Sequence, residues 1–126
     1  MFSGRYEYNI NQKGRVFVPA KMRDGLGERF MLSKSSTDTC LVIYTMEKWE
    51  AMMTELEQKA TATKSVRRKI SGNAAEMEID KQGRIIIPQS LREFAKLVDD
   101  VVIIGIGSTA EIWNPEELRI CEANDD

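Results

Sequence analysis

Two segments of the chain repeat one arrangement of basic residues. The segment "NQKGRVFVPAKMR" begins at residue 11 and the segment "DKQGRIIIPQSLR" begins at residue 80. Both fit the pattern (N or D)-x-x-G-R-x-x-x-P-x-x-x-R. Lys and Arg bind phosphate oxygens, and Arg also reads the O6 and N7 atoms of guanine. The residue types therefore favour binding of an anion such as nucleic acid, at two places in one chain.

Arg15 and Arg84 are the main candidates for that chemistry. Each follows a polar turn and opens a β-strand pattern, a position that projects a long cationic side chain from the tip of a sheet. Lys13 and Lys81 lie within three residues of these arginines. A carboxylate at Asp80 can hold Arg84 by a charge-assisted hydrogen bond. The alternative is a surface ion pair between turn and strand, which contributes little to stability.

The other shared positions are expected to shape the backbone. An Asx side chain binds nearby backbone N–H groups, Gly accepts a positive φ, and Pro suits the start of a helix at its first position. The residues assigned to these turns and strand–helix junctions are Asn11, Asp80, Gly14, Gly83, Pro19 and Pro88. Arg23 and Arg92 follow each proline by four residues, and they either pair locally with carboxylates or help to bind the ligand.

The two segments belong to a duplication, since an offset of 69 residues aligns them. Each copy reads as a strand, a turn, a second strand, a short helix and two further strands. We therefore predict one repeat at residues 5–47, a helical connector at 48–73 and a second repeat at 74–118. A helix is expected from about Met46, a short basic helix ending at Gly72, and a helix with Asn114 as N-cap and Pro115 at its first position.

One copy is too small to bury both faces of its sheet. Two copies can do so by packing or interleaving their strands into a closed barrel, which also removes exposed strand edges. The predicted fold class is therefore α+β, a duplicated β-β-α-β-β module that forms a barrel with flanking helices.

Composition limits the class of function. The chain has 126 residues, no His and two Cys, which are Cys40 and Cys121. The absence of His excludes Ser-His and Cys-His catalysis within one chain and argues against a structural zinc site. We expect the protein to have no enzymatic activity and no cofactor, although catalysis by Asp and Glu carboxylates stays open as the enzymatic alternative.

The sequence also bears on where the protein is found. The apolar run "VVIIGIG" is too short to span a bilayer, and "MFSGRYEYN" lacks the apolar stretch of a signal peptide. A cytoplasmic protein with buried, reduced cysteines is expected.

The net charge of −2 hides an uneven distribution. The net charge is +4 over residues 1–23, −4 over 24–57, +5 over 58–92 and −7 over 93–126. Each positive block contains one copy of the repeated pattern, so a folded chain can present a basic face while it is acidic overall. Arg5 lies in the first positive block, and we therefore include it among the candidate DNA-binding residues. The alternative is that the charge blocks are solvated surface.

The segments "GRVFVPAKMR", "DKQGRIIIPQSLR" and "EIWN" resemble the MraZ family of bacterial transcriptional regulators, over nearly the whole chain. The resemblance implies an AbrB-like swapped-hairpin barrel built from both copies, a double SpoVT/AbrB-like domain. It implies a ring-shaped homo-oligomer that binds short direct repeats in double-stranded promoter DNA, with no membrane partner and no small-molecule substrate. It also implies association with the nucleoid and regulation of a division and cell-wall gene cluster that includes the protein's own gene.

The family's D-x-x-x-R motif is matched in full by Asp80 and Arg84. In the first copy Asn11 replaces the Asp, so a charge-assisted hold on Arg15 is lost. A DNA-binding regulator is the favoured hypothesis. The alternative is a protein-interaction module, antitoxin-like, whose acidic C-terminal part binds a basic partner.

Overall fold

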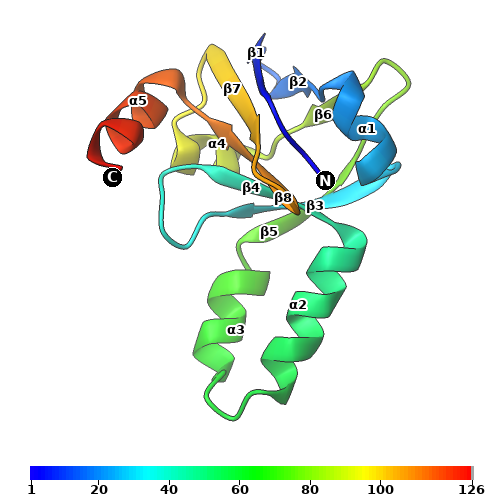
Figure 1. Ribbon diagram of the computed structural model, residues 1–126, viewed down its shortest axis with the longest axis vertical. Helices are drawn as coiled ribbons and strands as arrows, with labels where there is room; N and C mark the ends of the chain where they lie inside the picture. Colours follow the sequence, from blue (N-terminus) through cyan, green and yellow to red (C-terminus); the bar gives the residue numbers. More distant parts are fainter. Residues whose placement is uncertain (126) are drawn as a thin grey trace.

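The structure is a computed structural model that describes residues 1–125. It is an α+β fold with eight strands and five helices in the described residues. Figure 1 shows how these elements are arranged. The segment predicted as the first repeat, residues 5–47, contains β1 (Arg5–Asn9), β2 (Arg15–Phe17), α1 (Ala20–Leu26), β3 (Arg29–Lys34), β4 (Leu41–Thr45) and the start of α2 (Met46–Gln58). The segment predicted as the connector, residues 48–73, contains the rest of α2 and all of α3 (Lys64–Ser71). The segment predicted as the second repeat, residues 74–118, contains β5 (Ala74–Glu78), β6 (Arg84–Ile86), α4 (Gln89–Ala95), β7 (Asp100–Gly105), β8 (Thr109–Trp113) and the start of α5 (Pro115–Asn124).

The strands of the two repeats interleave. β1 pairs with β7, β3 with β5, β4 with β8 and β2 with β6, so each of these antiparallel pairs joins one repeat to the other. β3 also pairs with β4, and β7 pairs with β8, within their own repeats. Neither repeat therefore completes its strand pairing without its counterpart.

A closed barrel is not confirmed. Residues 1–125 form an open six-stranded sheet in the order β1-β7-β8-β4-β3-β5 and a separate two-stranded ribbon of β2 and β6. The chain leaves the sheet just after each edge strand: the Ile10 N–H donates to the Asp99 carbonyl and the Ile79 N–H to the Glu28 carbonyl, and a turn follows at once. The three-residue strands beyond the turns then pair with each other instead of closing the sheet.

The core draws on both repeats, because the sheet is shared. Phe30 and Leu32 from β3 pack in one buried cluster with Ile85 from β6 and Ile112 from β8. Fully burying a side chain of this size stabilises the fold by roughly 1.5–3 kcal/mol. Unfolding one repeat would expose apolar surface of the other, so the two repeats are expected to fold as one unit.

Most helix ends lie where the sequence predicts them. Thr45 caps α2, Gly72 ends α3, and Asn114 caps α5 with Pro115 in the first turn. The prediction of proline at the first helical position of α1 and α4 was wrong by one residue. Pro19 and Pro88 are N-cap residues because their ψ angles, 132° and 148°, are still extended.

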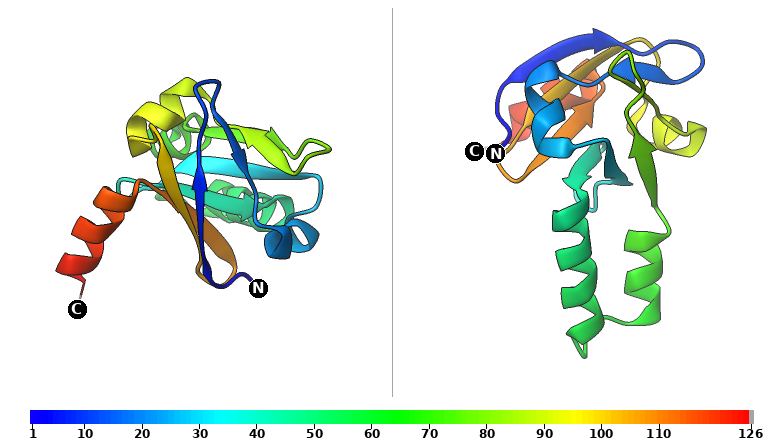
Figure 2. Two further views of the ribbon diagram at one scale, coloured as in Figure 1. Left: turned by 90° about the horizontal axis from the view of Figure 1, so that it is seen from above. Right: turned by 90° about the vertical axis from the view of Figure 1, so that its right-hand side faces the viewer.

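The α2–α3 hairpin projects from the sheet, as Figures 1 and 2 show. The first turn of α2 attaches it: Trp49 is buried, and its ring centroid lies 5.4 Å from that of Tyr44. The farther apolar residues of α2, Met52, Met53 and Leu56, are only half-buried. Within residues 1–125 no helix is long and apolar enough to cross a membrane.

The two cysteines differ in environment. Cys40 is buried and its thiol is free, and burial raises the pKa of that thiol. Cys121 is half-buried and also free. In the described part of the chain no group of three or more His, Cys, Asp or Glu residues is placed to hold a metal ion.

Candidate nucleic-acid interface

The two turns have the same backbone geometry. Oδ1 of Asn11 accepts hydrogen bonds from the N–H groups of Lys13 (3.0 Å) and Arg15 (2.9 Å). Oδ1 of Asp80 accepts the equivalent bonds from Gln82 and Arg84, both at 2.9 Å. A short polar side chain that satisfies two backbone donors favours a turn over a continued strand. The sequence-based prediction of Asx turns at both places is confirmed.

Each turn closes with a glycine in the left-handed region. Gly14 has φ +85° and Gly83 has φ +84°, conformations that side chains with a Cβ rarely adopt. Their N–H groups donate to the carbonyls of Asn11 and Asp80, both at 3.0 Å. The chain then enters β2 or β6, so the turn fixes where Arg15 and Arg84 start their strands.

The two arginines differ in what holds them. Nε of Arg84 lies 3.2 Å from Oδ2 of Asp80, which confirms the predicted charge-assisted pair. The hydrogen bond from the Arg84 backbone N–H is the main cause that holds the pKa of the Asp80 carboxyl below its usual range; desolvation opposes it, and the Gln82 N–H and the Arg84 guanidinium add to it. Within residues 1–125 the guanidinium of Arg15 forms no ion pair or hydrogen bond with another side chain.

The β2–β6 ribbon brings Arg15 and Arg84 onto one surface. Val16 and Ile85 are buried, so the residues that flank them in each strand point outward. In the antiparallel register Arg15 lies opposite Ile86 and Phe17 lies opposite Arg84. Arg15 and Arg84 are therefore diagonal neighbours, about 7–8 Å apart at their backbones. We call this surface, made of Arg15, Phe17, Arg84 and Ile86, the outward face of the ribbon.

Lys13 and Lys81 are exposed in the turns at the two ends of this ribbon. Figure 2 shows the ribbon with a turn at each end. Four of the sequence-predicted cations thus lie on the ribbon or in the turns at its two ends. Sequence reasoning missed Phe17 and Ile86. Strand alternation alone predicts that they share a face with the arginines, but which face is outward depends on what the ribbon covers.

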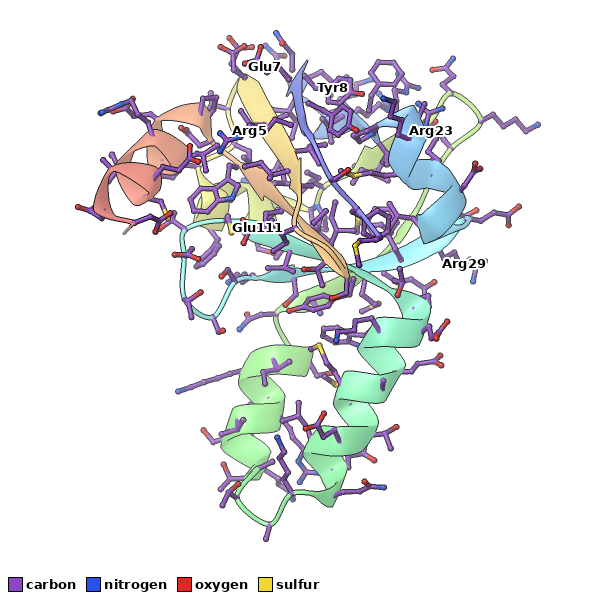
Figure 3. All side chains as sticks on the ribbon, in the orientation of Figure 1. Arg5, Glu7, Tyr8, Arg23, Arg29 and Glu111 are labelled. Atoms are coloured by element: carbon purple, nitrogen blue, oxygen red, sulfur yellow. The ribbon has the colours of Figure 1, made fainter. Side chains whose placement is uncertain are left out.

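Arg23 and Arg92 hold the turn of the opposite repeat. Nε of Arg23 donates to the Val18 carbonyl at 3.0 Å, and Nε of Arg92 donates to the Ile87 carbonyl at 2.9 Å. The Arg23 guanidinium lies against Gly83, where a Cβ would come within 2.3 Å of it. The Arg92 guanidinium lies against Gly14 in the same way, and a Cβ there would come within 2.9 Å of it. Figure 3 labels Arg23 on α1.

These contacts show which local partners Arg23 and Arg92 have. Local partners do engage Arg23 and Arg92, but the partners are backbone carbonyls, not carboxylates. Arg92 makes a second such bond through Nη1 to the carbonyl of Gln12 at 3.4 Å, across the repeat boundary. The guanidinium groups therefore brace the two turns against each other.

Arg5 lies apart from this cluster. It is at the start of β1, on the α5 side in Figure 3, whereas the turn follows the end of that strand. Its guanidinium pairs with the carboxylate of Glu122 in α5 through Nη1 and Nη2. The structure thus brings together Lys13, Arg15, Lys81 and Arg84, and places Arg5 in a different contact.

Comparison with known proteins identifies relatives of the chain. The family model "MraZ protein, putative antitoxin-like" matches residues 1–71 and again 70–126. A protein of Acetivibrio thermocellus named transcriptional regulator MraZ is 46% identical over 117 residues, covering 90% of this chain and 81% of that protein. Proteins of the same name from Thermoanaerobacter sp. and Desulforamulus reducens are 45% and 44% identical, covering 92% and 93% of this chain and 82% and 84% of those proteins.

Proposed function

This chain belongs to the MraZ family, and we propose that it is a sequence-specific DNA-binding regulator of transcription. The names of its relatives support regulation of transcription. The observation that carries the proposal of DNA binding is the outward face of the ribbon, where Arg15 and Arg84 are diagonal neighbours and each follows an Asx turn.

The geometry suits double-stranded DNA. A two-stranded β-ribbon fits the major groove of B-DNA, which is about 12 Å wide. In the proposed complex, Arg15 and Arg84 reach base edges, and Lys13 and Lys81 at the ribbon ends neutralise phosphates. The overall negative charge does not oppose this arrangement, because charges beyond a Debye length of about 8–10 Å are largely screened.

The finer features of the function are also proposals. One ribbon offers few contacts, so a ring-shaped homo-oligomer that meets successive direct repeats would raise the affinity through effective concentration. The proposed target is promoter DNA upstream of the division and cell-wall cluster that includes the protein's own gene. The proposed location is the cytoplasm, on the nucleoid. The division of the chain at 5–47, 48–73 and 74–118 into two AbrB-like repeats and a connector stays a prediction.

The antitoxin-like alternative depends on acidic groups in the C-terminal part. Three carboxylates of α5 already have partners within the chain: Glu122 pairs with Arg5, Glu117 with Lys96 and Glu116 with Arg119. A basic partner protein would have to displace these contacts. This observation favours the basic ribbon over α5 as the binding surface.

A fluorescence anisotropy titration tests the proposal, with labelled DNA from upstream of the gene at several salt concentrations. Arg15→Ala and Arg84→Ala are each expected to weaken binding and to reduce the slope of log affinity against log salt by about 1 where the side chain contacts phosphate; loss of a base contact would cost about 1–3 kcal/mol. Arg119→Ala is the matched control, since Arg119 is exposed on α5, away from the ribbon, and pairs with Glu116. Equal affinities and slopes for all four proteins would refute the assignment of the ribbon arginines.

A further inference from the structure

The outward face of the ribbon carries two apolar side chains as well as two arginines. Phe17 is 43% exposed and Ile86 is 56% exposed. The register sets Ile86 opposite Arg15 and Phe17 opposite Arg84. The four side chains thus form a small quadrilateral, with the arginines on one diagonal and the apolar pair on the other.

The hydrogen-bond pattern draws these side chains close together. The Val18 N–H donates to the Gly83 carbonyl and the Ile87 N–H to the Gly14 carbonyl, both at 2.8 Å. Since bonded and non-bonded pairs alternate in an antiparallel ribbon, the Arg15–Ile86 and Phe17–Arg84 pairs are non-hydrogen-bonded. Their Cα atoms are about 4.5 Å apart, the closer of the two spacings. Each arginine therefore has an apolar neighbour beside it on the surface.

Phe17 also packs against Tyr8, which limits the movement of its ring. Its ring centroid lies 6.4 Å from that of Tyr8 in β1, at an interplanar angle of 39°. Tyr8 is itself half-buried and packs against the main core. One side of the Phe17 ring is thus occupied by the protein, and the rest is open to a ligand.

The surroundings indicate which ligand would cover this pair. Lys13 and Lys81 flank the face at both ends, and Arg15 and Arg84 lie within it. A polyanion matches this charge. The apolar group that a DNA duplex presents in its major groove is the C5-methyl of thymine, next to the acceptor atoms that arginine reads.

We propose that Phe17 and Ile86 contact thymine methyl groups in the major groove and so set a preference for thymine beside the bases read by Arg84 and Arg15. This inference rests on the proposed function, because it assumes that the outward face of the ribbon enters the groove. It assigns to the apolar pair a part of the sequence specificity that cations alone cannot supply.

A duplex without the methyl groups tests the inference directly. The DNA upstream of the gene is prepared twice, once with thymine and once with uracil in its place, so that sequence and phosphates are the same. Burying one methyl group is worth roughly a fourfold change in affinity, and two are worth roughly fifteenfold. The wild-type protein should therefore bind the uracil duplex roughly 4–15 times more weakly.

The variants then locate the effect. The double variant Phe17→Ala/Ile86→Ala should bind both duplexes with equal affinity, and Ile86→Ala alone should lose part of the difference. Ile106→Ala is the control, because Ile106 is 51% exposed but lies in the turn between β7 and β8. It should keep the wild-type ratio. Circular dichroism melting curves establish that each variant is folded.

The possible outcomes separate this inference from the proposed function. Binding by the wild type without any preference for thymine would overturn the inference and leave the proposed function standing. A thymine preference that survives in the double variant would also overturn it. If the sedimentation behaviour of that variant is unchanged, the preference comes from DNA deformability; if it changes, Phe17 and Ile86 contact another copy of the chain. Failure of the wild-type protein to bind either duplex would overturn the proposed function itself.

Discussion

The first residues of the turn at 11–14 and of the turn at 80–83 differ by one chemical group. Asn11 has an amide where Asp80 has a carboxylate, and both supply the same Oδ1 atom to two backbone N–H groups. Only Asp80 has a second oxygen that can accept from an arginine, and Nε of Arg84 uses it. The shape of each turn thus depends on an oxygen acceptor that Asn11 and Asp80 both have. The hydrogen bond that holds Arg84 depends on the carboxylate charge, which only Asp80 has.

This difference has opposite effects on a ligand. Arg84 is oriented before binding, so less conformational entropy is lost when it meets DNA. Asp80 also cancels part of the positive charge at the second turn, whereas within residues 1–125 no ion pair offsets the charge of Lys13 or Arg15 at the first turn. The two halves of a nearly symmetric ribbon are therefore unequal: Arg84 is held in position before binding, and the turn that carries Arg15 attracts DNA more strongly.

The largest difference between the turns is expected at their glycines. In Gly14→Ala the new Cβ would come within 2.7 Å of the Ile87 backbone carbonyl, which cannot move away. In Gly83→Ala it would meet the end of the Arg23 side chain, which can shift more readily than a backbone carbonyl. The positive φ costs about 1–3 kcal/mol in both, and the backbone contact adds about 1–3 kcal/mol in Gly14→Ala. Urea unfolding should rank Gly14→Ala as the more destabilising.

Gly27→Ala separates backbone strain from close contact. Gly27 has φ +73°, and apart from its own chain neighbours no atom of residues 1–125 would lie within 4 Å of a Cβ there. Gly27→Ala should therefore lose only the stability that the positive φ costs, and it should be the least destabilised of the three variants. Equal losses in all three variants would mean that the arginine and carbonyl contacts at the turns do not matter.

A smaller effect is expected at the arginines that brace the turns. Arg23→Ala and Arg92→Ala each remove a hydrogen bond from a charged group to a partly buried carbonyl, worth about 1.5–3 kcal/mol. Arg92→Ala should be the more destabilising because it also loses the bond to the Gln12 carbonyl. Urea unfolding measures the loss, with Arg119→Ala as an exposed control that should change little.

The same variants show whether the bracing crosses between repeats. NMR amide shifts should change at Gly83 in Arg23→Ala and at Gly14 in Arg92→Ala, since each guanidinium lies against the glycine of the other repeat. Changes confined to the repeat that carries the substitution would contradict the reciprocal contact.

The smallest effect is expected from exchanging the two Asx residues. The fold lowers the pKa of Asp80 from its ordinary value of 3.8, chiefly through the Arg84 N–H, so it favours the ionised form. The stability that Asp80 contributes is complete above the ordinary pKa and is lost as the pH falls through the lowered one. Asp80→Asn should remove this loss of stability at acid pH, and Asn11→Asp should add an equivalent loss of stability that originates at the first turn.

Urea midpoints measured from neutral to strongly acidic pH test this exchange. Glu116 and Glu122 also have lowered pKa values, so each curve is compared with the wild type, which contains both. If Asp80→Asn and wild type lose stability in parallel at acid pH, the charge on Asp80 plays no part in the second turn.

Local structure followed from the sequence because its causes are close together in the chain. An Asx residue three positions before a glycine is enough to build each turn, and Asn114 before Pro115 is enough to cap α5. The Asp80–Arg84 pair was predictable for the same reason, since four residues separate the partners. The partner of Arg5 was not, because 117 residues separate it from Glu122.

The duplication, the two basic turns and the strand and helix segments could be predicted from the sequence, because each depends on neighbours within a few residues. The tertiary fold sets how the copies combine: strands of one repeat pair with strands of the other, and the sheet stays open. It alone placed Arg23 and Arg92 against the opposite turns, and Phe17 and Ile86 on the outward face of the ribbon. These outcomes depend on which distant segments share a core, and residue spacing along the chain does not carry that information.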